Sequence, residues 1–226
     1  MIVSGTPWYD TEGRLIQAHG GCVMEHEGRY YWYGEDKSGP TSSSATGRSF
    51  RVDVVGMRCY VSDDLMAWRN AGLALTAKPD AIEGTLAYDL HPSQFLERPS
   101  VMRCPSTKQF VMWMHVDSPR RDRAAVGVAV ADMPTGPFTY VRGFRPHDGD
   151  SRDMTVFQDR DGSAWLVNSS EKNLTMHVAR LTDDYLGLAG GYERIMIDRV
   201  REAPAVFRHS DLGPLALKMN GIFFFA

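Results

Sequence analysis

The chain has 226 residues, of which 43% are hydrophobic and 23% charged, and its formal net charge is −3. This balance is ordinary for a globular domain, and the length suffices for one large β domain. No run of Lys and Arg interleaved with aromatic residues occurs, which argues against a nucleic-acid partner, and no apolar run is long enough to span a membrane.

Three cysteines, Cys22, Cys59 and Cys104, lie far apart and form no Cys-x-x-Cys pair. This spacing argues against a zinc site, and the odd number argues against a full disulfide framework. We therefore expect three small, buried, hydrophobic side chains. The N-terminus shows no basic segment followed by an apolar stretch, so no signal peptide is visible.

The first predicted unit of β structure begins at His19 and contains four strands. Its second strand is rich in aromatic residues, which favour strands. A segment rich in Ser, Gly and Thr, from Asp36 to Arg51, is predicted to be a mobile, solvent-exposed loop. The four strands are predicted around Val23-Met24, Arg29 to Tyr33, Val55 to Val61 and Ala67-Trp68.

Two further units repeat this order of strands, and a fourth unit opens near the C-terminus. The second unit has predicted strands at Glu97 to Met102, Gln109 to Met114, Ala125 to Ala131 and Phe138 to Arg142. The third unit has predicted strands at Asp153 to Phe157, Ala164 to Val167, Thr175 to Leu181 and Tyr192 to Met196. The fourth unit opens at Glu202 and reaches Val206-Phe207.

The unit starts are 78, 56 and 49 residues apart. Four-stranded units at about this period predict the blades of a β-propeller, with the extra residues placed in loops. A β-sandwich or another all-β domain is the alternative, and the repeated order of strands argues against it.

The residues that open the inner strands are His19, Glu97, Asp153 and Glu202. In a propeller the inner strands surround one channel, so their starting ends meet at one mouth. Because gathered carboxylates repel one another and are costly to desolvate, a fold that collects them usually uses them. For any single acid, the alternative is a solvated strand end or an ion pair.

Paired carboxylates suit the cleavage of glycosidic bonds, in which one donates a proton and another group activates water or attacks. A third acid nearby raises the pKa of the donor by repulsion between like charges. Rings near the mouth offer faces on which sugars stack, although each is predicted first as part of the core. These rings belong to Trp8, Tyr33, Trp113 and His115.

Three arginines, Arg98, Arg152 and Arg201, adjoin the acids in sequence. Neighbouring side chains of a regular strand point to opposite faces. The arginine side chains are therefore predicted to point away from the channel and to neutralise carboxylates of adjacent strands.

Seven stretches of the chain, in this order, resemble family-43 glycoside hydrolases, which are five-bladed propellers, and the match is close to the exo-β-1,3-galactanase subgroup. Each stretch alone is weak, whereas the ordered set is highly specific and covers about residues 7 to 208. The stretches are Ala18-His-Gly-Gly21, Tyr30-Tyr-Trp-Tyr-Gly-Glu35, Glu97-Arg-Pro99, Met112-Trp-Met-His115, Ser151-Arg-Asp-Met-Thr155, Asp159-Arg-Asp-Gly162 and Arg201-Glu-Ala-Pro204. The resemblance implies an all-β, five-bladed β-propeller that is incomplete, with about three and a half blades present.

The resemblance also implies a role for each matching residue. Glu202 matches the general acid, and Asp153 matches the acid that tunes and orients this donor. Glu97 and Glu35 match acids that hold sugar hydroxyls, and Asn173 is a further candidate for contact with substrate. His19 is grouped with these substrate-binding candidates, with a structural histidine as the alternative.

Two departures from the family pattern stand out. Most of the family carries an Asp base on the first inner strand, where this chain has His19-Gly20-Gly21, as the galactanase-like subgroup does. That subgroup is thought to use a side-chain amide from a later blade instead. The resemblance also stops after Arg208, which predicts a partial propeller domain over 1–208 and a divergent tail over 209–226. A frameshift or a truncated gene model would explain this. We expect open sheet edges in such a chain, and little hydrolysis because the substitute base would lie in the missing part.

The favoured function is that of an inverting glycoside hydrolase that removes terminal sugars from plant-type polysaccharide, with exo-β-1,3-galactanase activity first. The alternatives are an arabinofuranosidase- or xylosidase-type hydrolase, a sugar-binding propeller without turnover, and a protein-interaction propeller. The expected partner is a galactan-type oligosaccharide or polysaccharide, with no nucleic acid, membrane, cofactor or metal. The full-length protein is expected to be secreted or periplasmic.

Overall fold

The computed structural model describes residues 5–43, 50–207, 216–219 and 222–225, and this part of the chain is an all-β structure, as predicted. Two short 3₁₀ helices, η1 (Leu86–Leu90) and η2 (Pro146–Asp148), interrupt the strands. Among the described residues, no helix has the length and apolar character needed to cross a membrane.

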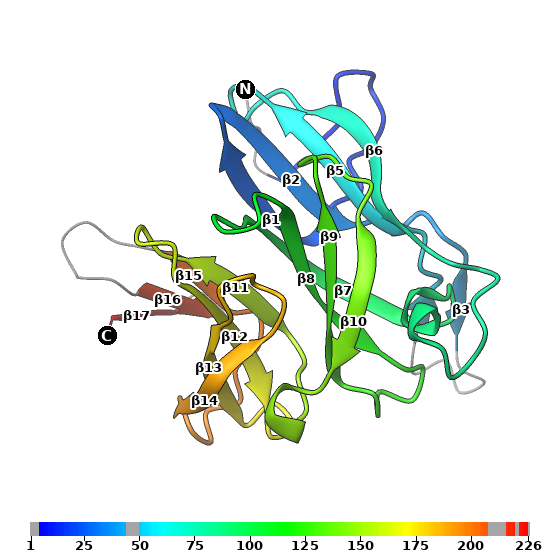
Figure 1. The fold of residues 1–226 in the computed structure, drawn as a ribbon. Helices are drawn as coiled ribbons and strands as arrows, with labels where there is room; N and C mark the ends of the chain where they lie inside the picture. The colour runs from blue at the N-terminus through cyan, green and yellow to red at the C-terminus, as the bar shows by residue number, and fades with distance from the viewer. Residues whose placement is uncertain (1–4, 44–49, 208–215, 220–221, 226) are drawn as a thin grey trace.

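The first sheet is antiparallel and has the strand order β1-β2-β5-β6 (Figure 1). Its strands are β1 (His19–His26), β2 (Arg29–Glu35), β5 (Gly56–Ser62) and β6 (Arg69–Thr76). The fourth strand starts after the predicted Ala67-Trp68, because the Asp64 carboxylate accepts hydrogen bonds from the N–H groups of Met66 and Ala67 and holds them in a turn.

The segment between β2 and β5 differs from the predicted exposed loop. It contains a separate hairpin of β3 (Thr41–Ser43) and β4 (Phe50–Val52). Asp36, at its start, is buried and forms an ion pair of 2.6 Å with Arg58. Residues 44–49, in the middle of the predicted loop, lie outside the described part of the chain.

The second and third sheets repeat the four-stranded antiparallel order, and their strands overlap the predicted ones, although the last strand of the third sheet begins at Leu188 and not at Tyr192. The second contains β7 (Phe95–Arg103), β8 (Phe110–Asp117), β9 (Ala125–Ala131) and β10 (Thr139–Phe144). The third contains β11 (Met154–Gln158), β12 (Ala164–Ser170), β13 (Thr175–Leu181) and β14 (Leu188–Ile195). A fourth sheet has the order β15 (Ala205–Phe207), β16 (Ala216–Met219) and β17 (Ile222–Phe225).

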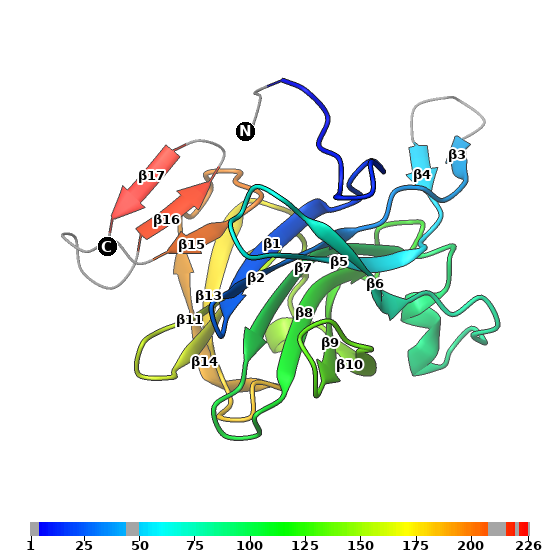
Figure 2. The same cartoon turned by 90° about the horizontal axis from the view of Figure 1, so that it is seen from above.

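The first strands of the successive sheets lie next to one another. β1 contacts β7, β7 contacts β11, and β11 contacts β15. Figure 2 shows the sheets fanning out from this row, from blue through green and yellow to red. The arrangement brings the starting ends of β1, β7 and β11 into one region of the molecule.

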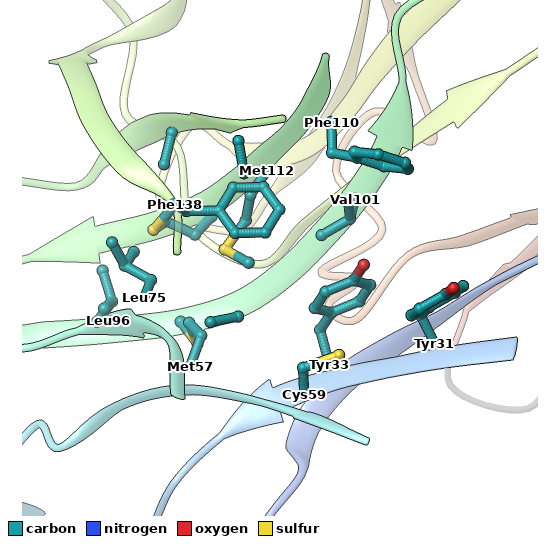
Figure 3. Packing of buried hydrophobic residues seen from close by; sticks show 14 of the residues in the cluster. Tyr31, Tyr33, Met57, Cys59, Leu75, Leu96, Val101, Phe110, Met112 and Phe138 are labelled. Atoms are coloured by element: carbon teal, nitrogen blue, oxygen red, sulfur yellow. The ribbon is translucent and has the colours of Figure 1, made fainter. Parts of the chain in front are cut away.

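Hydrophobic clusters fill the spaces between consecutive sheets. β8 is buried along its whole length because both of its faces are covered. Met112 and Met114 pack into the cluster shared with the first sheet, whereas Val111 and Trp113 pack into the cluster shared with the third. This alternation follows from the two-residue period of a strand. Figure 3 shows the first cluster, where side chains of the first and second sheets meet.

Candidate active site

A cavity of about 350 Å³ lies where the starting ends of the inner strands meet. The structure brings all six predicted site residues to its wall. They are His19, Glu35, Glu97, Asp153, Asn173 and Glu202. Four further residues complete the lining, namely Arg98, His115, Arg121 and Arg152. The geometry therefore gathers four carboxylates, three guanidinium groups and two imidazoles in one space.

The glycines after His19 make room for Glu35 at the first edge of the cavity. His19 and Glu35 are paired across β1 and β2, and a bulge follows His19. Gly20 has a φ of +58°, and a Cβ there would lie 2.9 Å from Glu35 Oε1. A Cβ on Gly21 would lie 1.8 Å from the Tyr33 carbonyl oxygen. A side chain at Gly21 would therefore collide with backbone, whereas one at Gly20 would displace the Glu35 carboxylate and would sit on left-handed backbone.

Glu35 is nearly completely buried, yet it contacts three donors. Its Oε1 lies 3.4 Å from His19 Nδ1 and accepts a 3.3 Å hydrogen bond from the Arg98 backbone N–H. Its Oε2 forms an ion pair with Lys37. The hydrogen bond to Glu35 raises the pKa of His19, against the lowering effect of partial burial. Lys37 was not predicted as part of the site.

Arg98 points into the cavity, which corrects the prediction that its side chain points away. A bulge lies between Glu97 and Ser100, and Arg98 has a φ of +54° within it. Such backbone is rare for a residue other than glycine and stores strain. The resulting turn of the chain places Arg98 Nη2 2.8 Å from Asp153 Oδ2 on the third sheet.

Glu97 is held by an arginine that sequence reasoning missed. Arg121, in the loop between β8 and β9, donates two hydrogen bonds to the Glu97 carboxylate, at 2.9 and 3.2 Å. Burial raises the pKa of Glu97, but the Arg121 hydrogen bonds and the charges of Arg121 and His115 outweigh it, so the pKa is lowered. The only sequence signal was the run of arginines at 120, 121 and 123 after a strand.

Behind Glu97, His115 Nε2 lies 3.9 Å from Glu97 Oε2 and 3.4 Å from Asp117 Oδ2. Burial raises the pKa of Asp117, but hydrogen bonds from His115 and from backbone N–H groups outweigh it and lower the pKa. Arg152 Nη1 lies 3.8 Å from the same Asp117 oxygen. Arg152 therefore lines the cavity and does not point away from it as predicted, while Arg201 is outside the lining.

Glu202, just before β15, lies on the wall formed by the third and fourth sheets. Its Oε1 accepts a 2.5 Å hydrogen bond from the amide of Asn173, whose own oxygen accepts one from the Ser169 hydroxyl at 2.9 Å. Asp153 Oδ2 accepts a 3.1 Å hydrogen bond from the backbone N–H of Ala203, the residue after Glu202. Asp153 therefore fixes the backbone that carries Glu202.

The predicted stacking rings fall into two groups. Tyr33 and Trp113 are fully buried, and their polar atoms donate to the carbonyls of Pro134 and Tyr185, so both belong to the core. Trp8 is half-buried and packs edge-on against Trp32, away from the cavity. Among the four predicted rings, His115 lines the cavity.

The carboxylates of the cavity differ in their partners. Glu35, Glu97 and Asp153 each pair with a cation, namely Lys37, Arg121 and Arg98 respectively. Within the described part of the chain, Glu202 has a neutral amide as its partner instead. The charge of its neighbour therefore sets Glu202 apart from the other three carboxylates of the cavity.

The comparisons with known proteins agree on one family. The family model described as glycosyl hydrolases family 43 matches residues 23–221. This match ends within the segment predicted as a divergent tail, and the boundary at residue 208 stays a prediction. A search of curated protein sequences returned no match.

Three solved structures illustrate the likeness. A GH43 β-1,3-galactosidase with galactodeoxynojirimycin has 31% identity and a TM-score of 0.81, over 98% of this chain and 78% of the other. An exo-β-1,3-galactanase variant from Phanerochaete chrysosporium with β-1,3-galactotriose has 35% identity and a TM-score of 0.83, over 98% of this chain and 47% of the other. An exo-β-1,3-galactanase from Clostridium thermocellum has 33% identity and a TM-score of 0.81, over 97% of this chain and 46% of the other. The chain thus spans about half the length of the two galactanases.

Proposed function

This chain belongs to family 43 of the glycosyl hydrolases, and from that premise we propose that it is an exo-β-1,3-galactanase-type enzyme that releases terminal galactose by an inverting mechanism. Solved structures similar to it are described as a β-1,3-galactosidase and as exo-β-1,3-galactanases, and two of them contain galactodeoxynojirimycin or β-1,3-galactotriose. In this proposal the sheets are consecutive blades of a five-bladed propeller, with the cavity at the mouth of its channel.

Glu202 is the general acid of the proposed reaction. It donates its proton to the glycosidic oxygen as the bond to the leaving sugar breaks, while a water molecule attacks the anomeric carbon from the opposite face and gives a proton to a general base. The supporting observation is that Glu202, alone among the cavity carboxylates of the described chain, contacts a neutral amide and not a cation. A proton donor must carry a proton, and a neighbouring cation would favour its loss.

Asp153 supports this acid in the proposal. Its carboxylate accepts a hydrogen bond from the Ala203 N–H and pairs with Arg98, and these contacts fix it beside the segment of Glu202. A nearby anion stabilises the protonated form of a second carboxyl by repulsion.

Glu35 and Glu97 bind sugar hydroxyls in the proposal, with His19 and Asn173 at the edges of the same cavity. Both glutamates are held by ion pairs, which leave their remaining lone pairs available to accept from hydroxyl groups. Ordered acceptors of this kind give a sugar pocket its orientation and specificity.

The test is the release of galactose from β-1,3-galactan by the chain and by its Glu202→Gln variant, with arabinan and xylan as control substrates. We expect release from galactan to be slow in the wild type, as predicted from the sequence, and to fall at least a hundredfold further in the variant, because general acid catalysis contributes about 10²–10⁴-fold. Binding of β-1,3-galactotriose should persist.

Glu193→Gln, which changes an exposed glutamate on β14, is the matched control and should keep full activity. Release from arabinan or xylan but not from galactan would reject the galactanase assignment. Equal galactose release by wild type and Glu202→Gln would reject Glu202 as the acid.

A further inference from the structure

A second cavity, of about 550 Å³, adjoins the candidate active site. The two cavities share Arg121 and Arg152 in their linings, so they lie on either side of these side chains. Two other cations, Arg145 and Lys172, line the second cavity without reaching the first. Four cations and three acids thus line the second cavity, which takes no part in the reaction proposed above.

The acids of the second cavity are already engaged by other groups. Asp122 pairs with Arg120 at 3.1 Å and accepts from the Ser118 hydroxyl. Asp150 accepts from the backbone N–H groups of Glu171 and Lys172, at 2.7 and 3.0 Å.

Glu171, the third acid, is held from outside the cavity. It accepts two hydrogen bonds from Arg194, at 2.6 and 2.7 Å, and Arg194 is not part of the lining. The charge of each acid is therefore compensated by a cation or by backbone donors before any ligand arrives.

Arg145 and Lys172 contrast with these acids. Both side chains are exposed, and neither forms an ion pair with another described residue. They reach the cavity from different segments, the residue before η2 and the turn between β12 and β13. The wall of the cavity thus carries two cationic groups without anionic partners.

We propose that this second cavity is a subsite for an anionic substituent on the sugar chain whose terminal unit occupies the first cavity. Guanidinium and ammonium groups form charge-assisted hydrogen bonds with carboxylates and sulfates, which are stronger than their hydrogen bonds with neutral hydroxyls. The substituent is a uronic acid carboxylate or a sulfate ester. The inference rests on the proposed function for the position of the substrate, and the subsite itself rests on the charges described here.

The experiment compares three β-1,3-galacto-oligosaccharides that differ at one branch, which is neutral, carries a glucuronate or carries a sulfate ester. We expect a several-fold preference in kcat/KM for an anionic substrate over the neutral one, and a loss of this preference above about 0.5 M salt, because exposed charges are screened. The combined variant Arg145→Gln, Lys172→Gln should reduce the preference about fivefold, as expected for two exposed ion pairs.

The combined variant Lys108→Gln, Arg180→Gln is the matched control, because it removes two exposed cations that line neither cavity, one in the turn between β7 and β8 and one near the end of β13. Lys108 also shares the left-handed backbone of Lys172, with φ values of 66° and 59°. This control should keep the preference. A wild-type enzyme that cleaves all three substrates equally would overturn the subsite and leave the proposed function standing.

If no substrate is cleaved, the proposed function fails. The subsite is then tested by measuring the affinity of the same three oligosaccharides by calorimetry. Tighter binding of an anionic oligosaccharide that the Arg145 and Lys172 variant abolishes would support the subsite. Equal affinity for all three would overturn it. The glucuronate and sulfate arms decide which anion the subsite takes.

Discussion

Asn173 and Glu202 form the contact on which the proposed proton transfer most depends. The Asn173 amide donates to Glu202 Oε1 at 2.5 Å, and Asn173 itself has a φ of +68°. Asparagine tolerates this left-handed backbone better than most residues. The sequence suggested that Asn173 contacts the substrate, whereas in the structure its amide is turned to the acid.

Asn173→Gly is predicted to lower kcat for galactose release about tenfold to hundredfold with little change in KM. Glycine removes the amide and accepts the left-handed backbone without strain, so the effect reports the lost orientation of Glu202. Steady-state kinetics measure it. Lys108→Gly is the control for added backbone freedom, because Lys108 also has left-handed backbone and lies outside the cavity lining. A raised KM with unchanged kcat would instead identify Asn173 as a substrate contact.

Among the secondary-structure elements, the turn between β12 and β13 places Asn173 in the wall of the cavity. Glu171, Lys172 and Asn173 are all left-handed, with φ values of 52°, 59° and 68°. Three such residues in a row are unfavourable unless their surroundings hold them. Asp150 holds the backbone of this turn, and Arg194 and His177 hold the Glu171 side chain.

Glu171→Gln is predicted to lower the Tm at neutral pH and to lose this effect in acid. Hydrogen bonds from Arg194 and His177 lower the pKa of Glu171 from 4.5 to about 2. A lowered folded-state pKa stabilises the protein above the unfolded value, and this contribution is lost as pH falls from 4.5 towards 2. The difference in Tm between wild type and variant should therefore shrink between about pH 5 and pH 3.

Melting curves across this range provide the measurement, and Glu193→Gln, an exposed acid on the same third sheet, is the control. A Tm difference that stays constant with pH would show that the ion pair of Glu171 does not hold the turn.

At the scale of the whole molecule, buried clusters between consecutive sheets join the sheets into one body. Trp113 of β8 links the second sheet to the third, because its Nε1–H donates to the Tyr185 carbonyl at 2.8 Å in a fully buried setting. A buried hydrogen bond of this kind costs most when one partner is removed and the other is left unsatisfied.

Trp113→Phe is predicted to lower the free energy of unfolding by about 1–3 kcal/mol from the unsatisfied Tyr185 carbonyl, in addition to the effect of the smaller ring. Trp68→Phe is a matched control, because Trp68 is also buried but its Nε1 has no hydrogen-bond partner among the residues that the structure describes. Urea unfolding of both variants gives the comparison. If Trp68→Phe lowered the free energy of unfolding as much as Trp113→Phe, the lost hydrogen bond would not be the cause of the destabilisation.

The sequence by itself determined the strands, their repeated order and the acids that open the inner strands, because alternation and turn residues act within a few positions of one another. It also carried the family resemblance that the comparisons confirm. The six predicted site residues meet in one cavity, since each opens or ends a strand of the repeated unit or lies on a turn at the same mouth.

The positions of the cations in the site depend on the tertiary structure and could not be predicted from the sequence. Arg98 enters the cavity through a bulge with left-handed backbone, and Arg121 arrives on a loop whose sequence has no periodic pattern. The Arg98–Asp153 ion pair joins two sheets. Because the two residues are far apart in sequence, no local sequence pattern around either of them indicates the pair. The two-residue period of a strand predicts the face to which a side chain points. Bulges, loops and ion pairs between sheets change the direction of the side chain, and these features depend on how the chain packs.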